Sequence, residues 1–172
     1  LSSSSAASDV YKRQSLSDYV FAPESYKLTE ALHSDFPNFV DRLSKGHKFD
    51  VTTNIFEKLP EIFTDDKPEC ESIQLIGRLN NERVIKFVPK KYIKGPGNLD
   101  KYKVILPKAN GSGAIGEVLS TPLVGTPLVG TPLVGHTQTF ISIGKLETLD
   151  EADSLFKYIK SVSYTHLTLP TK

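Results

Sequence analysis

The sequence lacks several of the residues on which common kinds of protein site depend. It holds one cysteine, Cys70, in 172 residues, which excludes a disulfide framework and a zinc site built from several thiolates. His33, His47 and His136 show no metal-ligand spacing with one another or with Cys70, so we expect no metal site. No apolar run approaches the roughly 20 residues that cross a bilayer, and no signal peptide is visible. We therefore expect a cytoplasmic protein with no membrane partner.

Catalytic motifs and methionine are missing as well. The sequence contains no Gly-x-Ser-x-Gly, no P-loop and no His-Glu-x-x-His, so it predicts no catalytic residue. It also contains no methionine, with which a complete reading frame normally begins. We expect the chain to be a fragment of a larger protein.

Both ends of the chain resemble the translation of a non-coding DNA element rather than native protein. Residues 6–14 read Ala-Ala-Ser-Asp-Val-Tyr-Lys-Arg-Gln, and residues 162–169 read Val-Ser-Tyr-Thr-His-Leu-Thr-Leu. When the first stretch is back-translated, its reverse complement in a shifted frame encodes the second. This DNA element resembles the transposase adapter of sequencing libraries. We expect residues 1–14 and 161–172 to be adapter-derived and non-native; the alternative is a serine-rich tail and a final strand.

The first part of the remaining sequence predicts a short helix. Apolar residues recur at helical spacing in residues 34–44. Ser34 or Asp35 would cap this helix, and Pro37 would lie in its first turn. We expect residues 15–69 to form a helical connecting segment.

The second part is rich in strand patterns. Residues 72–77 and 82–88 flank Asn80-Asn81, which is a good hairpin-turn signal because asparagine tolerates a positive φ. Residues 102–106 and 137–143 predict two more strands. Thr148-Leu-Asp-Glu151 is a capping box that starts a helix running to about residue 160. The expected fold class is α+β, with a mixed or antiparallel sheet and flanking helices.

Three identical copies of Thr-Pro-Leu-Val-Gly occupy residues 121–135. A proline at every fifth residue removes a backbone donor, which argues against a continuous helix and against a central strand. Known solenoid repeats have longer periods or other patterns. We expect an expanded loop, whether the triplication is native or an assembly error.

Residues 111–116 match the pattern Gly-x-Gly-x-x-Gly. A dinucleotide site requires this turn to open a helix whose N-terminus meets the pyrophosphate. Pro122 and the prolines after it prevent such a helix. The glycines therefore indicate a flexible loop, whose residues are Asn110, Gly111, Ser112 and Gly113.

Basic residues are concentrated in residues 78–108, although the 21 basic and 20 acidic residues of the whole chain nearly balance. Only Glu82 and Asp100 oppose them within this stretch. Tyr92 and Tyr102 are interleaved, and the pattern fits either a solvated strand face or a surface that contacts DNA phosphates. The expected DNA-backbone residues are Arg78, Arg83, Lys86, Lys90, Lys91, Lys94, Lys101, Lys103 and Lys108.

Four consecutive polar side chains follow the last repeat: His136, Thr137, Gln138 and Thr139. Glutamine pairs bidentately with adenine, and threonine contacts the methyl group of thymine. These four residues are therefore candidates for base readout. The alternative is a half-exposed strand end.

Several segments of the second half resemble a known family. Residues 98–113, 116–122 and 135–144 carry the resemblance, and residues 76–84 and 90–93 are similar too. They resemble the C-terminal region of type II restriction–modification enzymes, in which a TaqI-like target-recognition domain follows an adenine-specific DNA methyltransferase domain. The resemblance covers roughly residues 70–160 and is much weaker over residues 15–69.

The resemblance implies that residues 70–160 form a target-recognition module for double-stranded DNA in a bacterial cytoplasm. An upstream domain of the same chain would methylate adenine with S-adenosylmethionine. The fragment itself lacks the family's Asn/Asp-Pro-Pro-Tyr/Phe motif and its glycine-rich cofactor loop, so we expect no cofactor here. Whether a restriction endonuclease is fused to the larger protein from which this fragment would come stays open. The alternatives are a non-enzymatic DNA specificity subunit and a nucleotide-binding enzyme that uses residues 111–116.

Overall fold

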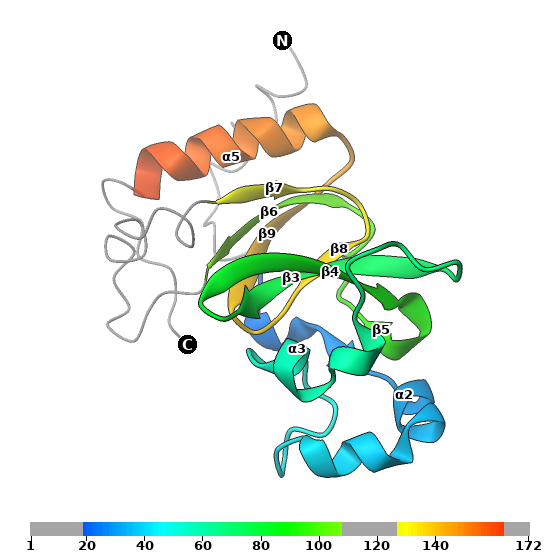
Figure 1. Ribbon diagram of the computed structural model, residues 1–172. Coiled ribbons are helices and arrows are strands. Elements are labelled where there is room, and N and C mark those ends of the chain that lie inside the picture. Colours follow the sequence, from blue (N-terminus) through cyan, green and yellow to red (C-terminus); the bar gives the residue numbers. More distant parts are fainter. Residues whose placement is uncertain (1–18, 108–126, 164–172) are drawn as a thin grey trace.

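The computed structural model describes residues 19–107 and 127–163, which form an α+β fold (Figure 1). A four-stranded antiparallel sheet has the order β1-β9-β6-β7, and a three-stranded mixed sheet has the order β4-β3-β8. Strands β2 and β5 form a small third sheet. The expected fold class, with antiparallel and mixed sheets and flanking helices, is confirmed.

The strands of the larger sheets are β1 (Val20–Phe21), β3 (Ser72–Leu79), β4 (Glu82–Pro89), β6 (Tyr102–Pro107), β7 (Leu128–Gly130), β8 (Val134–His136) and β9 (Phe140–Leu146). The small sheet pairs β2 (Lys27–Leu28) with β5 (Ile93–Lys94). The α-helices are α2 (Glu30–Asp35), α3 (Ile55–Lys58) and α5 (Leu149–Ser163). Short 3-10 helices are η2 (Pro23–Ser25), η3 (Pro37–Arg42), η4 (Pro60–Ile62) and η5 (Lys90–Tyr92).

The β3–β4 hairpin forms around the predicted turn. Asn80 and Asn81 have φ angles of 53° and 65°, which is the left-handed pair that a two-residue type I′ turn requires. Leu79 pairs with Glu82 on either side of the turn. The pairing continues without a bulge to the far ends of both strands, so this turn fixes the register of the whole hairpin.

Helix α5 begins at the predicted capping box. The backbone N–H of Glu151 donates to Thr148 Oγ1 at 3.2 Å, which satisfies one of the free donors of the first turn. Ala152, Leu155 and Ile159 recur at helical spacing and are fully buried. They pack against the four-stranded sheet, and Figure 1 shows α5 lying across β7, β6 and β9.

The helix predicted over residues 34–44 is not formed as a single element. Helix α2 ends at Asp35, and η3 starts at Pro37. Phe36 between them has φ −133° and ψ 65°, because the proline ring disfavours the α conformation in the residue before it. Pro37 therefore separates two short helices, where the sequence had suggested the first turn of one.

Residues 19–69 are part of the fold and do not only connect domains, which corrects the expected boundary at residue 70. Tyr26, Leu32 and Phe56 share one buried cluster with Ile73 and Leu75 of the hairpin. In addition, β1 pairs with β9 of the four-stranded sheet. Without this segment the four-stranded sheet would lack β1 and the small sheet would lack β2.

The expectation of a loop throughout residues 121–135 is wrong for residues 128–130 and 134–135, which lie in strands. The second copy of the repeat supplies β7, and the third supplies the start of β8. β7 lies at the edge of its sheet and β8 at the edge of the mixed sheet, where it runs parallel to β3. Pro127 and Pro132 fall outside both strands, so no ladder hydrogen bond is lost and the prolines are tolerated.

Gly135 allows β8 to approach Tyr26, and a methyl group there is expected to destabilise the protein. A Cβ at residue 135 would lie 2.5 Å from Tyr26 Cε1 and 2.9 Å from Leu75 Cδ2. We expect Gly135→Ala to lower the free energy of unfolding by about 1–3 kcal/mol, measured by urea denaturation. Gly97→Ala is the matched control, because its Cβ would meet only the end of the Lys145 side chain, with Nζ at 3.4 Å and Cε at 3.9 Å. Equal effects of the two variants would contradict this close packing.

Two copies of the repeat are sufficient for β7 and β8. Deleting one Thr-Pro-Leu-Val-Gly copy leaves two identical copies and shortens only the connection between β6 and β7. Because loop-closure entropy changes slowly with length, we expect the free energy of unfolding to change by a few tenths of a kcal/mol. Loss of cooperative thermal unfolding in the deletion variant would show that all three copies are needed.

Candidate nucleic-acid interface

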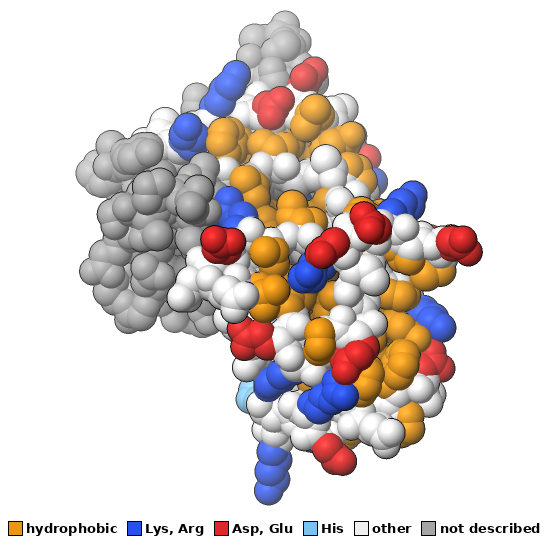
Figure 2. Space-filling view, in the orientation of Figure 1, with side chains coloured by type: hydrophobic (Ala, Val, Ile, Leu, Met, Phe, Trp, Pro, Cys, Tyr) orange, Lys and Arg blue, Asp and Glu red, His pale blue; other side chains and the backbone are white. Residues whose placement is uncertain are grey.

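Four of the nine expected DNA-backbone residues form ion pairs with carboxylates from outside the basic stretch. These pairs are Lys86–Asp65 at 2.7 Å, Lys90–Glu71 at 3.1 Å, Lys91–Asp35 at 3.1 Å and Lys101–Glu147 at 2.9 Å. Figure 2 accordingly shows basic and acidic side chains interspersed on the face in view. Exposed pairs of this kind contribute little to stability, so the lysines can exchange a carboxylate for a phosphate.

Lys103 does not face the solvent, which corrects its expected contact with a phosphate. Its side chain is fully buried, and Nζ donates to the carbonyl oxygens of Asn98 and Leu99 at 2.8 Å each. Burial lowers the pKa of Lys103 to about 7, partly opposed by the charge of Asp100. Lys103 therefore holds the chain before β6 in place. Lys108 and the loop residues Asn110, Gly111, Ser112 and Gly113 lie outside the described residues.

Arg78 and Arg83 lie directly opposite each other near the turn of the hairpin. Arg78 Nη2 donates to Asn81 Oδ1 at 3.3 Å. The guanidinium of Arg83 lies over the ring of Phe140, 5.5 Å from its centroid, and partial burial lowers the pKa of Arg83. Both arginines are half-buried. Lys94, at the end of β5, is exposed.

His136 and Thr137 are fully buried, so they are not available for base readout in this fold. The carbonyl oxygen of Thr137 lies 3.0 Å from His136 Nδ1 and can only accept, so Nδ1 carries the proton. Nε2 then accepts from Ser142 Oγ at 3.3 Å, and Ser142 Oγ accepts from Asn98 Nδ2 at 3.1 Å. This chain of bonds joins β8, β9 and the residues before β6. Burial lowers the pKa of His136 to about 4.

Gln138 and Thr139 remain at the surface, in the turn between β8 and β9. The predicted strand starts later than expected, because the Phe140 N–H donates to the Thr137 carbonyl at 3.1 Å and closes a turn. Both side chains are half-buried. The last pair between β3 and β8 joins Ile76 to His136, so Arg78 and Gln138 each lie two residues beyond it. Because β8 runs parallel to β3, the chain that carries Gln138 leaves β8 at the same end of the mixed sheet as the hairpin turn.

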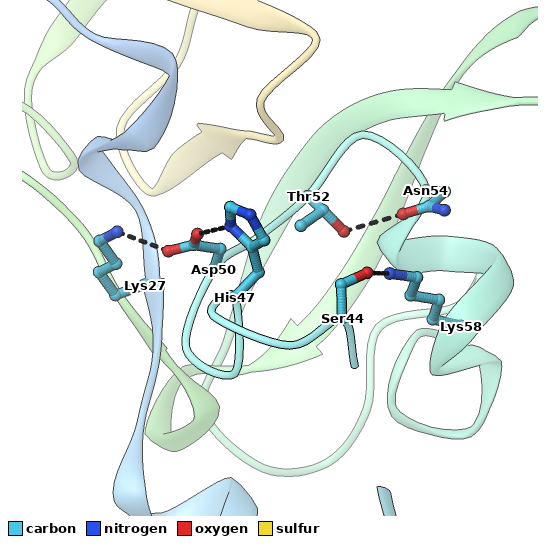
Figure 3. Close-up of polar contacts among 7 residues, drawn as sticks. All are labelled: Lys27, Ser44, His47, Asp50, Thr52, Asn54 and Lys58. Atoms are coloured by element: carbon cyan, nitrogen blue, oxygen red, sulfur yellow. Dashed lines mark hydrogen bonds and ion pairs between the residues drawn. The ribbon is translucent and has the colours of Figure 1, made fainter. Parts of the chain in front are cut away.

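The loop before α3 supports this turn, and no sequence pattern predicted this contact. The Gln138 N–H donates to the Val51 carbonyl at 3.1 Å. Next to Val51, the Asp50 carboxylate accepts from Lys27 at 2.6 Å and from His47 at 2.7 Å (Figure 3). These two bonds lower the pKa of Asp50. Figure 3 also shows Lys58 bonded to Ser44 and Thr52 bonded to Asn54 along the same loop.

Two further findings concern only residues 19–107 and 127–163. Within them, no three His, Cys, Asp or Glu side chains come together as a metal site would require. Within the same ranges, no helix is both long and apolar enough to cross a membrane.

Comparison of the chain with protein-family models, with curated proteins and with solved structures gives no match.

Burial of neutral His136 makes stability depend on pH. The folded-state pKa of about 4 lies below the ordinary value of 6.5, so the unfolded chain binds a proton first as the pH falls. Between pH 6.5 and 4 we expect the free energy of unfolding to fall by up to about 3 kcal/mol from this residue. Urea denaturation across this range measures the slope. His136→Gln should have a shallower slope than the wild type, and equal slopes would contradict a buried neutral histidine.

Proposed function

We propose that this chain recognises a DNA target within a bacterial, cytoplasmic restriction–modification enzyme. The observation that carries the proposal is that half-exposed Gln138, after β8, and the opposed Arg78 and Arg83, next to the hairpin turn, lie at the same end of the mixed sheet. A planar amide and two guanidinium groups at one end of a sheet offer the donors and acceptors that base edges and phosphates require. The resemblance of residues 70–160 to a TaqI-like target-recognition domain supports the same function.

In this proposal the basic side chains have different roles. Lysines along β4, η5 and β5 attract the DNA backbone without regard to sequence. Gln138 and Thr139 are the remaining candidates for base readout, since His136 and Thr137 are buried. Asp50 and Val51 act as positioning residues for the turn that carries Gln138.

Catalysis belongs to the upstream domain in this proposal. That domain would bind S-adenosylmethionine and methylate the exocyclic amino group of adenine. Enzymes that modify a base extrude it from the stack, so the flanking duplex has to be held in register. The recognition module, residues 70–160, would keep the duplex in register through contacts on either side of the flipped base.

The proposal predicts binding to duplex DNA that weakens with salt. If about four basic side chains contact phosphates, log K should fall with log salt at a slope of roughly −3.6. The measurement is fluorescence anisotropy with a random-sequence duplex and with duplexes that the full chain enriches from a random library. Salt-independent binding, or no binding, would contradict the proposed function.

Two variants separate readout from backbone attraction. Gln138→Ala should reduce the preference for the enriched duplexes over random ones. Lys94→Ala should weaken binding to all duplexes alike and make the salt slope shallower by about 1. Lys157→Ala, an exposed charge on α5, is the matched control and should change neither quantity. If Gln138→Ala weakens binding to all duplexes equally, Gln138 does not read bases.

A further inference from the structure

We infer that Lys94 and Lys145 hold one DNA phosphate between them, over Gly97. This inference rests on the proposed DNA-recognition function and adds a phosphate contact that the sequence did not indicate. Lys94, at the end of β5, belongs to the expected DNA-backbone residues, whereas Lys145 lies in β9, outside the basic stretch of residues 78–108. The position of the two lysines, their lack of carboxylate partners and the fixed loop between them support the shared phosphate.

The loop after β5 brings the two lysines to one place. A Cβ at Gly97 would lie 3.4 Å from Lys145 Nζ and 3.9 Å from Lys145 Cε, so the end of the Lys145 side chain extends over Gly97. Lys94 precedes Gly97 by three residues, which span at most about 11 Å. Both lysines have a flexible four-carbon stem, so their ammonium groups can reach the same phosphate.

Neither of these two ammonium groups is neutralised by a carboxylate. Lys94 and Lys145 are exposed, and neither forms an ion pair with another of the described residues. Of the carboxylates near the loop, Glu147 pairs with Lys101 at 2.9 Å, and Asp100 acts on the charge of the same lysine. Two unpaired positive charges close together repel each other, and an anion between them offsets this repulsion.

The loop that carries Gly97 is fixed against β9. Asn98 is buried, and its Nδ2 donates to the carbonyl oxygen of Gly144, next to Lys145, at 3.0 Å. Lys103 Nζ donates to the carbonyl oxygen of Asn98 at 2.8 Å. Gly97 itself is exposed, and its lack of a side chain lets a phosphate approach the backbone closely. The site therefore needs little ordering when the phosphate arrives.

Strand β2 connects this loop to the turn that carries Gln138. Lys27 pairs with Lys94 in the small sheet and with Asp50 through an isolated bridge, and Val51 accepts from the Gln138 N–H. With neighbouring strands about 4.8 Å apart, the backbones of Gln138 and Lys94 lie within about 20 Å. This distance is about six base pairs of duplex, so one DNA molecule can contact both. Lys27 is itself paired with Asp50 at 2.6 Å and is not part of the phosphate site.

The test is a double-mutant cycle of Lys94→Gln and Lys145→Gln in the full chain. Binding to a random-sequence duplex is measured by fluorescence anisotropy at several salt concentrations. Either change should weaken binding about two- to fivefold and make the salt slope shallower by about 1. The double variant should bind as the single variants do, because all three lose the same contact. Lys157→Gln, on α5, is the matched control and should bind as the wild type does.

Substitution of Gly97 provides a second readout. Gly97→Asp places a carboxylate beside the Lys145 ammonium group and should weaken binding as Lys145→Gln does. Gly97→Asn has nearly the same size without the charge and should weaken binding less. Thermal unfolding of each variant shows whether the fold is intact. Equal effects of the aspartate and asparagine variants on binding would contradict the role of the Lys145 charge.

The inference is overturned if Lys145→Gln binds as the wild type does. It is also overturned if the double variant loses twice as much of the salt slope as either single variant, because the two lysines would then contact separate phosphates. In both outcomes the wild type still binds duplex DNA, and the proposed function stands. If the wild type binds no duplex, or binds it independently of salt, the proposed function itself fails, and this inference fails with it.

Discussion

The parallel pairing of β8 with β3 is the contact on which the rest of the structure depends. Three residue pairs, ending at Ile76 and His136, join the third repeat to the hairpin. The chain then turns within three residues and enters β9, in the other large sheet. This short connection makes the two sheets adjacent and places Gln138 at the end of the mixed sheet that carries the β3–β4 turn. Gly135 is essential to it, because Tyr26 occupies the space that a side chain would need.

The buried polar side chains of the described residues lie where the two large sheets meet, around the connection from β8 to β9. His136, Ser142, Asn98 and Lys103 are linked by hydrogen bonds to one another or to neighbouring carbonyls. Removing one partner from a buried network leaves the others desolvated and unpaired, which is costly. The network therefore disfavours other registers between the sheets, and it keeps the turn at residues 137–139 in a single arrangement.

Local signals in the sequence predicted the local elements. Asn80-Asn81 identified the hairpin, Thr148 and Glu151 identified the start of α5, and the fold class followed from the order of strands and helices. These features depend on neighbours along the chain, and a single sequence displays them. Pro37 was misread because a proline suits a helix start and a helix end equally well until the packing of α2 is known.

Long-range features could not be predicted from the sequence, for a different reason. Lys103 alternates with Lys101 as an exposed strand residue would, and only the pairing of β6 with both β7 and β9 shows that it is buried. The repeat was expected to be a loop because its prolines exclude central strands, although edge strands accept them. The carboxylates that pair with the lysines come from three separate parts of the chain: Asp35, the segment with Asp65 and Glu71, and Glu147. None of these partners can be assigned before the fold is known.

The central claim is that the turn end of the hairpin and the turn at Gln138 together form a DNA-contacting surface. Nuclear magnetic resonance of the labelled chain, titrated with a duplex that it selects, tests this claim most directly. The account predicts shifts of the Gln138 side-chain amide and of the Arg78 and Arg83 guanidinium resonances, while the amides of α5 stay unchanged. Shifts confined to α5, or no shift at Gln138 and the two arginines while the duplex is bound, would contradict it.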